Sequence, residues 1–133
     1  MEHEGTKYVS SWSPNGQFLL CSRVSKAGIG VWTVEASGDH KVTPLIDTPA
    51  REVNGQLSPD GRWVAYQSNE SGRDEVYLTA FPAGGQRFPI SSAGGMVPRW
   101  SRDGRGIFFV SGRERWPSSL GEQKLRSSTQ API

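Results

Sequence analysis

The 133-residue sequence is poor in the residues that build catalytic and metal sites. Its single cysteine, Cys21, excludes an internal disulfide, and its two histidines, His3 and His40, lie far apart. Metal-ligand spacings, phosphate-binding glycine loops, serine-hydrolase motifs and protein-kinase motifs are all absent. The sequence therefore predicts no catalytic residue, no metal and no cofactor.

Charge and long apolar runs are also scarce. Charged residues make up 21% of the chain and the net charge is +2, but residues 112–133 hold four basic and two acidic residues, which leaves eleven of each in residues 1–111. A neutral body without a basic stripe argues against a nucleic-acid partner. No apolar run approaches the roughly eighteen residues of a membrane helix, and the N-terminal residues lack a signal-peptide pattern. We expect no membrane segment in the sequence as written.

Uninterrupted helical stretches are missing as well. Sixteen glycines and nine prolines divide the chain too often for a ten-residue amphipathic helix to persist in residues 1–111. Apolar residues nevertheless make up 35% of the chain, which is enough for a packed core. These two observations favour an all-β fold.

One short phrase occurs three times. It reads Trp-Ser-Pro-Asn-Gly at 12–16, Leu-Ser-Pro-Asp-Gly at 57–61 and Trp-Ser-Arg-Asp-Gly at 100–104, and its glycines are 45 and 43 residues apart. Proline presets φ for a turn, Asp or Asn bonds the nearby backbone, and glycine accepts positive φ. The phrase thus predicts hairpin turns whose structural residues are Asn15, Gly16, Asp60, Gly61, Asp103 and Gly104.

Each turn is followed by a run that is apolar at consecutive positions, at 18–21, 63–66 and 107–110. Such runs indicate strands that are buried on both faces, as in stacked sheets. Third strands are expected at 29–34 and 75–80, and fourth strands at 41–46 and 86–90. Four short antiparallel strands in a period of about 40–45 residues are typical of one blade of a β-propeller.

The second copy carries a family resemblance. Residues 57–68 (Leu-Ser-Pro-Asp-Gly-Arg-Trp-Val-Ala-Tyr-Gln-Ser), followed by Gly72 and by Glu-Val-Tyr-Leu at 75–78, resemble the repeat of TolB-like (WD40-like, PD40) propellers. The similarity is greatest to the propeller regions attached to some bacterial Ser/Thr protein kinases. The Gly-His and Trp-Asp dipeptides of true WD40 repeats are missing.

The resemblance implies a partial propeller of about two and a half blades within residues 1–111. We expect blades at 8–46, 53–90 and 96–111, the last of which ends after its second strand near Ser111. Residues 112–133 depart from the repeat. We expect them to form an irregular tail, and a frameshift in the coding DNA would explain why the repeat is lost there.

Ring geometry suggests where a ligand would bind. The strand before each turn would line the central channel, which places Ser11, Gln56 and Arg99 at equivalent positions and Lys7 and Glu52 near the channel mouth. Of these residues, Arg99 is the strongest candidate to bind a ligand. A structural role, in which the arginine ties neighbouring blades together, would explain its presence too. The tryptophans are expected to pack in the core.

Three interpretations remain open at this point, two of which assign a function to the chain. The first is a non-catalytic sensor or interaction module with a protein or peptide partner, linked in some relatives to a kinase. The second is the substrate-gating propeller of a serine peptidase resembling prolyl oligopeptidase, and the third is a non-functional gene remnant. The resemblance suggests a periplasmic protein or the extracytoplasmic part of a membrane-linked protein. Because the end blades lack neighbours, we also expect self-association through their open faces.

Overall fold

The computed structural model of the chain describes residues 7–92, 94–110 and 120–124. Every regular element in these ranges is a β-strand, and the strands form three antiparallel sheets. The first sheet, blade 1, contains β1 (Lys7–Trp12), β2 (Phe18–Val24), β3 (Ile29–Glu35) and β4 (Val42–Ile46). Blade 2 contains β5 (Glu52–Leu57), β6 (Trp63–Ser68), β7 (Glu75–Ala80) and β8 (Arg87–Pro89). Blade 3 contains β9 (Met96–Trp100), β10 (Gly106–Val110) and β11 (Leu120–Lys124).

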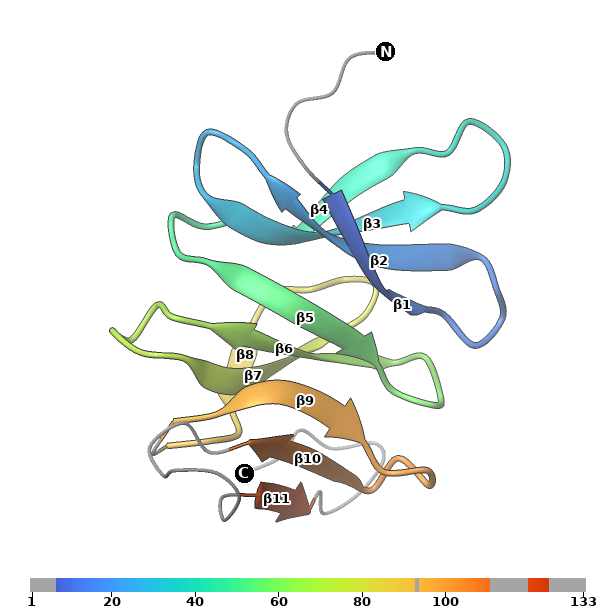
Figure 1. Cartoon of the computed structure of the whole chain (residues 1–133). Helices are drawn as coiled ribbons and strands as arrows, with labels where there is room; N and C mark the ends of the chain where they lie inside the picture. The colour runs from blue at the N-terminus through green and yellow to red at the C-terminus, as the bar shows by residue number, and fades with distance from the viewer. Residues whose placement is uncertain (1–6, 93, 111–119, 125–133) are drawn as a thin grey trace.

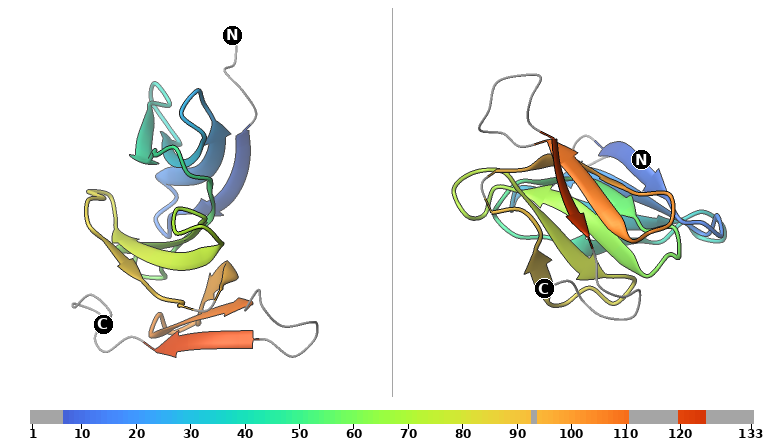
Figure 2. Two further views of the ribbon diagram at one scale, coloured as in Figure 1. Left: turned by 90° about the vertical axis from the view of Figure 1, so that its left-hand side faces the viewer. Right: turned by 90° about the horizontal axis from the view of Figure 1, so that it is seen from below.

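The blades are stacked in chain order, as Figures 1 and 2 show. Within each blade the strands pair with their sequence neighbours, so every connection is a hairpin. The first strand of each new blade contacts the sheet before it: β5 packs against β1, β2 and β3, and β9 packs against β5, β6 and β7. This arrangement is a partial β-propeller, and the all-β prediction is confirmed.

Strand β6 explains why the apolar runs are continuous. Its successive side chains point to opposite faces of blade 2. Val64 and Tyr66 pack toward blade 1, whereas Ala65 packs toward blade 3. All three are at most 1% exposed. A strand between two sheets needs apolar residues at consecutive positions, which is the pattern that the sequence shows.

Two apolar clusters hold the blades together. The cluster between blades 1 and 2 consists of Leu20, Val31, Leu57, Val64, Tyr66 and Tyr77, and the stacked rings of Tyr66 and Tyr77 lie 5.8 Å apart. The cluster between blades 2 and 3 consists of Ala65, Val76, Leu78, Ile90 and Ile107. Burial of each large aliphatic side chain contributes about 1.5–3 kcal/mol. Both interfaces are therefore built like the interior of one domain.

A strand from the tail joins blade 3. Five tail residues, Leu120–Lys124, form strand β11, which pairs antiparallel with β10 in a continuous register from Gly106↔Lys124 to Val110↔Leu120. The apolar strand β10 has an unpaired edge, and a further strand satisfies the backbone groups of that edge whether or not its sequence follows the repeat. The rest of the predicted irregular tail lies outside the described residues.

The first strand of each blade is irregular. Its pairing with the second strand shifts register near Val9 in β1, between Val53 and Gln56 in β5, and near Val97 in β9. Asn54 and Val97, at equivalent repeat positions, adopt φ of 58° and 55°. A bulge of this kind bends a strand and increases its twist.

Candidate functional site

The three hairpin turns repeat one hydrogen-bond pattern. In the second, Ser58 Oγ donates to Asp60 Oδ1 at 2.6 Å, and Asp60 Oδ1 also accepts the Arg62 N–H at 3.0 Å. Ser13 with Asn15, and Ser101 with Asp103, make the same contacts at 2.7 Å. In the third turn, the Arg105 amide and the Ser101 hydroxyl hold the pKa of Asp103 below its usual value. These carboxylate and amide groups are turn formers, as predicted.

The glycines of the turns also adopt the predicted conformation. Gly16, Gly61 and Gly104 have φ of 74°, 74° and 75°. Successive turns stack on one another: a Cβ on Gly61 would lie 3.5 Å from Pro14 Cδ, and a Cβ on Gly104 would lie 3.4 Å from Pro59 Cδ. A Cβ on Gly16, in the first blade, would meet nothing within 4 Å. The proline of one blade thus covers the glycine of the next.

Ser11 and Gln56 tie neighbouring blades together. Ser11 Oγ accepts the Leu57 N–H at 3.1 Å, and Gln56 Nε2 donates to the Ser10 carbonyl at 2.9 Å. The Gln56 carbonyl in turn accepts the indole N–H of Trp100 at 2.9 Å. Both predicted channel residues are therefore engaged in the joints between β1, β5 and β9.

Arg99 occupies the equivalent position in β9 and is exposed. Its Nη1 donates to the carbonyl of Pro98 in the same strand at 2.8 Å. Arg99 pairs across the sheet with Phe108, so both side chains belong to the face of blade 3 that points away from blade 2. The structure does not bring Arg99 together with Ser11 and Gln56 in one pocket.

Lys7 and Glu52 differ from the expected channel-mouth pair. Lys7 lies at the start of β1, opposite Arg23, and its side chain is outside the described part of the chain. Glu52 is 0% exposed and accepts hydrogen bonds from Thr48 Oγ1 at 2.6 Å and Ser68 Oγ at 3.3 Å, both at Oε2. Its Oε1 is buried without a partner, and burial raises the pKa of this carboxyl. Glu52 is thus closed to a ligand, contrary to the prediction.

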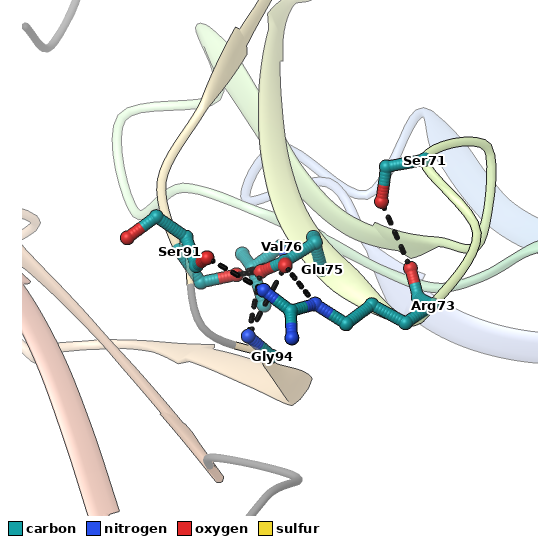
Figure 3. A network of polar contacts seen from close by, with 7 residues as sticks. Ser71, Arg73, Glu75, Val76, Ser91 and Gly94 are labelled. Atoms are coloured by element: carbon teal, nitrogen blue, oxygen red, sulfur yellow. Dashed lines mark hydrogen bonds and ion pairs between the residues drawn. The ribbon is translucent and has the colours of Figure 1, made fainter.

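A second buried carboxylate fixes the linker between blades 2 and 3 (Figure 3). Glu75, at the start of β7, accepts hydrogen bonds from the Ser91 hydroxyl and from the Gly94 amide, the latter at 3.0 and 3.1 Å. Arg73 Nε pairs with Glu75 Oε2 at 2.9 Å, and Arg73 Nη2 donates to the Ser92 carbonyl at 2.8 Å. This network anchors the linker and leaves no carboxylate oxygen of Glu75 for a ligand.

One cavity that the described residues line was not foreseen from the sequence. It has a volume of about 530 Å³ and lies at the seam of blades 1 and 2, lined by Thr48, Pro49, Ala50, Asn69, Glu70 and Arg87. We call it the seam pocket. A smaller cavity of about 150 Å³, to which Tyr66, Thr79 and Leu45 contribute, shares Thr48, Glu70 and Arg87 with it. The two cavities therefore adjoin at these three residues.

An ion pair defines the polarity of the seam pocket. Arg87 Nη2 lies 2.6 Å from Glu70 Oε2, and the Arg87 side chain is 51% exposed. The Glu70 carboxylate, which accepts a hydrogen bond from the guanidinium, raises the pKa of Arg87. Tyr66, which also lines the smaller cavity, is nearly fully buried, and burial raises the pKa of its hydroxyl, which stays protonated at neutral pH. The two cavities thus combine a charged pair with a neutral tyrosine side chain.

The lining residues of this pocket come from a linker, a hairpin and an outer strand. None of them belongs to the repeated phrase, so the periodicity of the sequence carried no signal for the site. Among the described residues, no group of three His, Cys, Asp or Glu side chains is placed to hold a metal ion. The described part of the chain also contains no helix of the length and hydropathy that a membrane crossing requires.

Comparisons with known proteins support the fold. A scan against protein families gave no match. An uncharacterized protein of Agrobacterium fabrum (strain C58) is 24% identical over 105 residues, which cover 78% of this chain and 36% of that protein. The chain thus spans little more than a third of the length of this relative.

Solved structures show the same fold at low sequence identity. A TolB-type protein of Agrobacterium tumefaciens superposes with a TM-score of 0.75 and 23% identity, over 83% of this chain and 40% of its own. TolB of Acinetobacter baumannii gives 0.71 and 19%, over 93% and 31%. A structure from a study of two prolyl endopeptidases gives 0.54 and 12%, over 91% and 22%. The chain therefore has the fold of TolB-like propellers and spans less than half of each of these proteins.

Proposed function

We propose that the chain is a non-catalytic propeller module that binds an extended segment of a protein or peptide partner. The observation that carries this proposal is the seam pocket, whose volume falls in the range of ligand sites in general. Its Asn69, Glu70 and Arg87 side chains supply donors and acceptors suited to a peptide backbone and to charged side chains. The smaller cavity behind it, with Tyr66 and Thr79, would receive one side chain of the partner.

The rigid frame around the pocket supports this proposal. Thr48 Oγ1 donates to the buried Glu52 and accepts the Ala50 N–H at 3.1 Å, which fixes one wall. Asn69 Oδ1 accepts the Arg51 N–H at 2.9 Å and so joins that wall to the opposite hairpin. A preorganised site loses little conformational entropy when a peptide binds.

A peptide selection tests the proposal. A random peptide library displayed on phage is selected against the full chain and, in parallel, against Arg87→Ala and the control Arg62→Ala, in which an exposed arginine of the second hairpin turn is replaced. We expect peptides that bind the wild type and Arg62→Ala alike and bind Arg87→Ala roughly tenfold or more weakly, because the charge-assisted contact of the guanidinium with the peptide is lost. Selection of no peptide, or equal binding to Arg87→Ala, would contradict the proposal.

A second candidate is the substrate-gating propeller of a serine peptidase. The likeness to a prolyl endopeptidase structure favours it, although at 12% identity this likeness concerns the fold. The coding DNA next to this sequence distinguishes the two candidates. A hydrolase domain with a Gly-x-Ser-x-Gly motif would support gating, whereas a kinase domain would support the sensor role of some propellers that the sequence resembles.

A further inference from the structure

The face of blade 1 that points away from blade 2 carries exposed apolar side chains beside Arg23, whose guanidinium lies over the Trp32 ring. Leu20 and Val31 pack toward blade 2, so the alternating partners in the same strands point to the other side. This side includes Trp12, paired with Leu19, and Val9, paired with Cys21. Trp12 is 59% and Val9 62% exposed. We call this surface the blade-1 open face.

The opposite end of the stack has a matching surface. In β10, Ile107 is fully buried against blade 2, so its neighbour Phe108 points away from blade 2. Val110 lies on the same side, and both residues are partly exposed. These two residues, with Arg99 opposite Phe108, form the blade-3 open face.

The repeat shows what each open face is built to contact. Trp12 and Trp100 stand at the same position, one residue before the turn serine. Trp100 is covered at the joint of blades 2 and 3, where its Nε1 donates to the Gln56 carbonyl at 2.9 Å. Arg99 is the repeat equivalent of Gln56, so the carbonyl of Arg99 is the acceptor that Trp12 would reach on a preceding blade.

The turns indicate a second place where blade 1 could receive a neighbour. Gly61 and Gly104 are covered by Pro14 and Pro59 of the preceding blade, whereas the space beside Gly16 is empty. Arg102 holds the proline position in the third turn. A blade 3 placed on a blade 1 would bring Arg102 against Gly16. Among the described residues, Trp12 is largely exposed and nothing lies beside Gly16, and a blade 3 could cover both positions.

We propose that two copies of this chain dock head to tail, with the blade-3 open face of one copy on the blade-1 open face of the other. The occupant is a second copy because the contact continues an interface that the chain already makes twice, between blades 1 and 2 and between blades 2 and 3. The two faces are different surfaces, so the interface is heterologous, and it either closes into a ring or extends. The seam pocket lies between blades 1 and 2 and stays accessible.

The test uses one variant on each face. Trp12→Asp and Phe108→Asp each place a charge in the proposed interface, and Val24→Asp is the control, since Val24 is 37% exposed and lies on the other side of β2. Sedimentation velocity from 1 to 100 µM is expected to show association of the wild type and of Val24→Asp. Each face variant alone should associate roughly tenfold or more weakly, because aromatic anchors dominate such interfaces.

Mixing the variants distinguishes head-to-tail docking from a symmetric dimer. Trp12→Asp retains an intact blade-3 face and Phe108→Asp an intact blade-1 face, so a 1:1 mixture should form the heterodimer that neither forms alone. Circular dichroism confirms folding of each variant, and Trp12→Ser and Phe108→Ser replace any variant that does not fold. A wild type that stays monomeric at 100 µM, a Phe108 variant that still self-associates, or a mixture of folded variants that stays monomeric would overturn the proposal.

Discussion

At each hairpin turn a glycine adopts a positive φ that side-chain-bearing residues rarely accept. We expect Gly16→Ala and Gly61→Ala each to lower the free energy of unfolding by about 1 kcal/mol. The two values should be similar, because the new Cβ meets nothing at Gly16 and makes an ordinary contact with Pro14 at Gly61. Chemical denaturation of the two variants and the wild type measures both values.

A substitution at Gly30 tests the effect of steric conflict without backbone strain. It has no positive φ, but a Cβ there would lie 2.4 Å from the Ile46 carbonyl oxygen in the neighbouring strand β4. Gly30→Ala is therefore expected to destabilise the chain more than Gly16→Ala does. A smaller effect at Gly30 would mean that β4 moves away without a loss of stability.

The buried carboxyl of Glu52 makes stability depend on pH. Burial raises its pKa, so the folded chain binds this proton more tightly than the unfolded chain does. Its contribution to stability is present below the unfolded pKa and is lost as the pH rises through the folded pKa. We expect the wild type to lose stability relative to Glu52→Gln as the pH rises above the unfolded glutamate pKa of about 4.3.

Denaturation midpoints at several pH values measure this difference. Glu35→Gln is the control, because Glu35 is exposed at the end of β3. A stability difference between wild type and Glu52→Gln that does not change with pH would contradict the assigned burial effect.

At the scale of single elements, the bulge in β9 places a β-branched residue in a strained conformation. Val97 has φ of 55°, and its N–H donates to Gln67 Oε1 at 3.0 Å. Asn54 adopts φ of 58° at the equivalent position of β5, and asparagine tolerates this region better than valine does. Val97→Asn should therefore raise the free energy of unfolding by about 1 kcal/mol and keep the bond to Gln67.

Val9→Asn is the matched control for this substitution. Val9 occupies the same repeat position in β1, is more exposed than Val97 and has no positive φ. Thermal denaturation should show a gain for Val97→Asn and none for Val9→Asn. Equal gains at both positions would point to a cause other than backbone strain.

The sequence predicted those elements whose residues repeat. The turns at Gly16, Gly61 and Gly104 and the third strands β3 and β7 were found because local turn chemistry and hydrophobic pattern determine them. Strand β11 was missed, because it is recruited by the unpaired edge of β10 and not by its own pattern. Long-range pairing of that kind leaves no local signature.

The candidate site was likewise predicted only where its residues belong to the repeat. Ring geometry placed Ser11 and Gln56 at equivalent positions of the first strands. It did not predict that both residues would link neighbouring blades. Glu52 was expected near a channel mouth and is buried, since the linker residue Thr48 folds over it. The seam pocket uses linker and hairpin residues, whose positions depend on how two blades pack and not on either repeat alone.

For the whole molecule, head-to-tail docking makes thermal stability depend on protein concentration. If copies bind through their folded faces, mass action favours the folded state as the protein concentration rises. The thermal midpoint of the wild type should therefore increase between about 1 and 100 µM, whereas that of Trp12→Asp should stay constant. Scanning calorimetry or fluorescence melts over this range measure the effect. A midpoint independent of concentration in both proteins would contradict it.

The stacking of Pro14 on Gly61 and of Pro59 on Gly104 has an evolutionary consequence. Blades 1 and 2 each present a proline on one side and a glycine on the other, so the two described joints share the same contact. A gene that gains or loses one whole period of about 40–45 residues brings together the same two partners at the new junction. Blade number can therefore change by duplication or deletion of a period with this proline and glycine, without any compensating substitution.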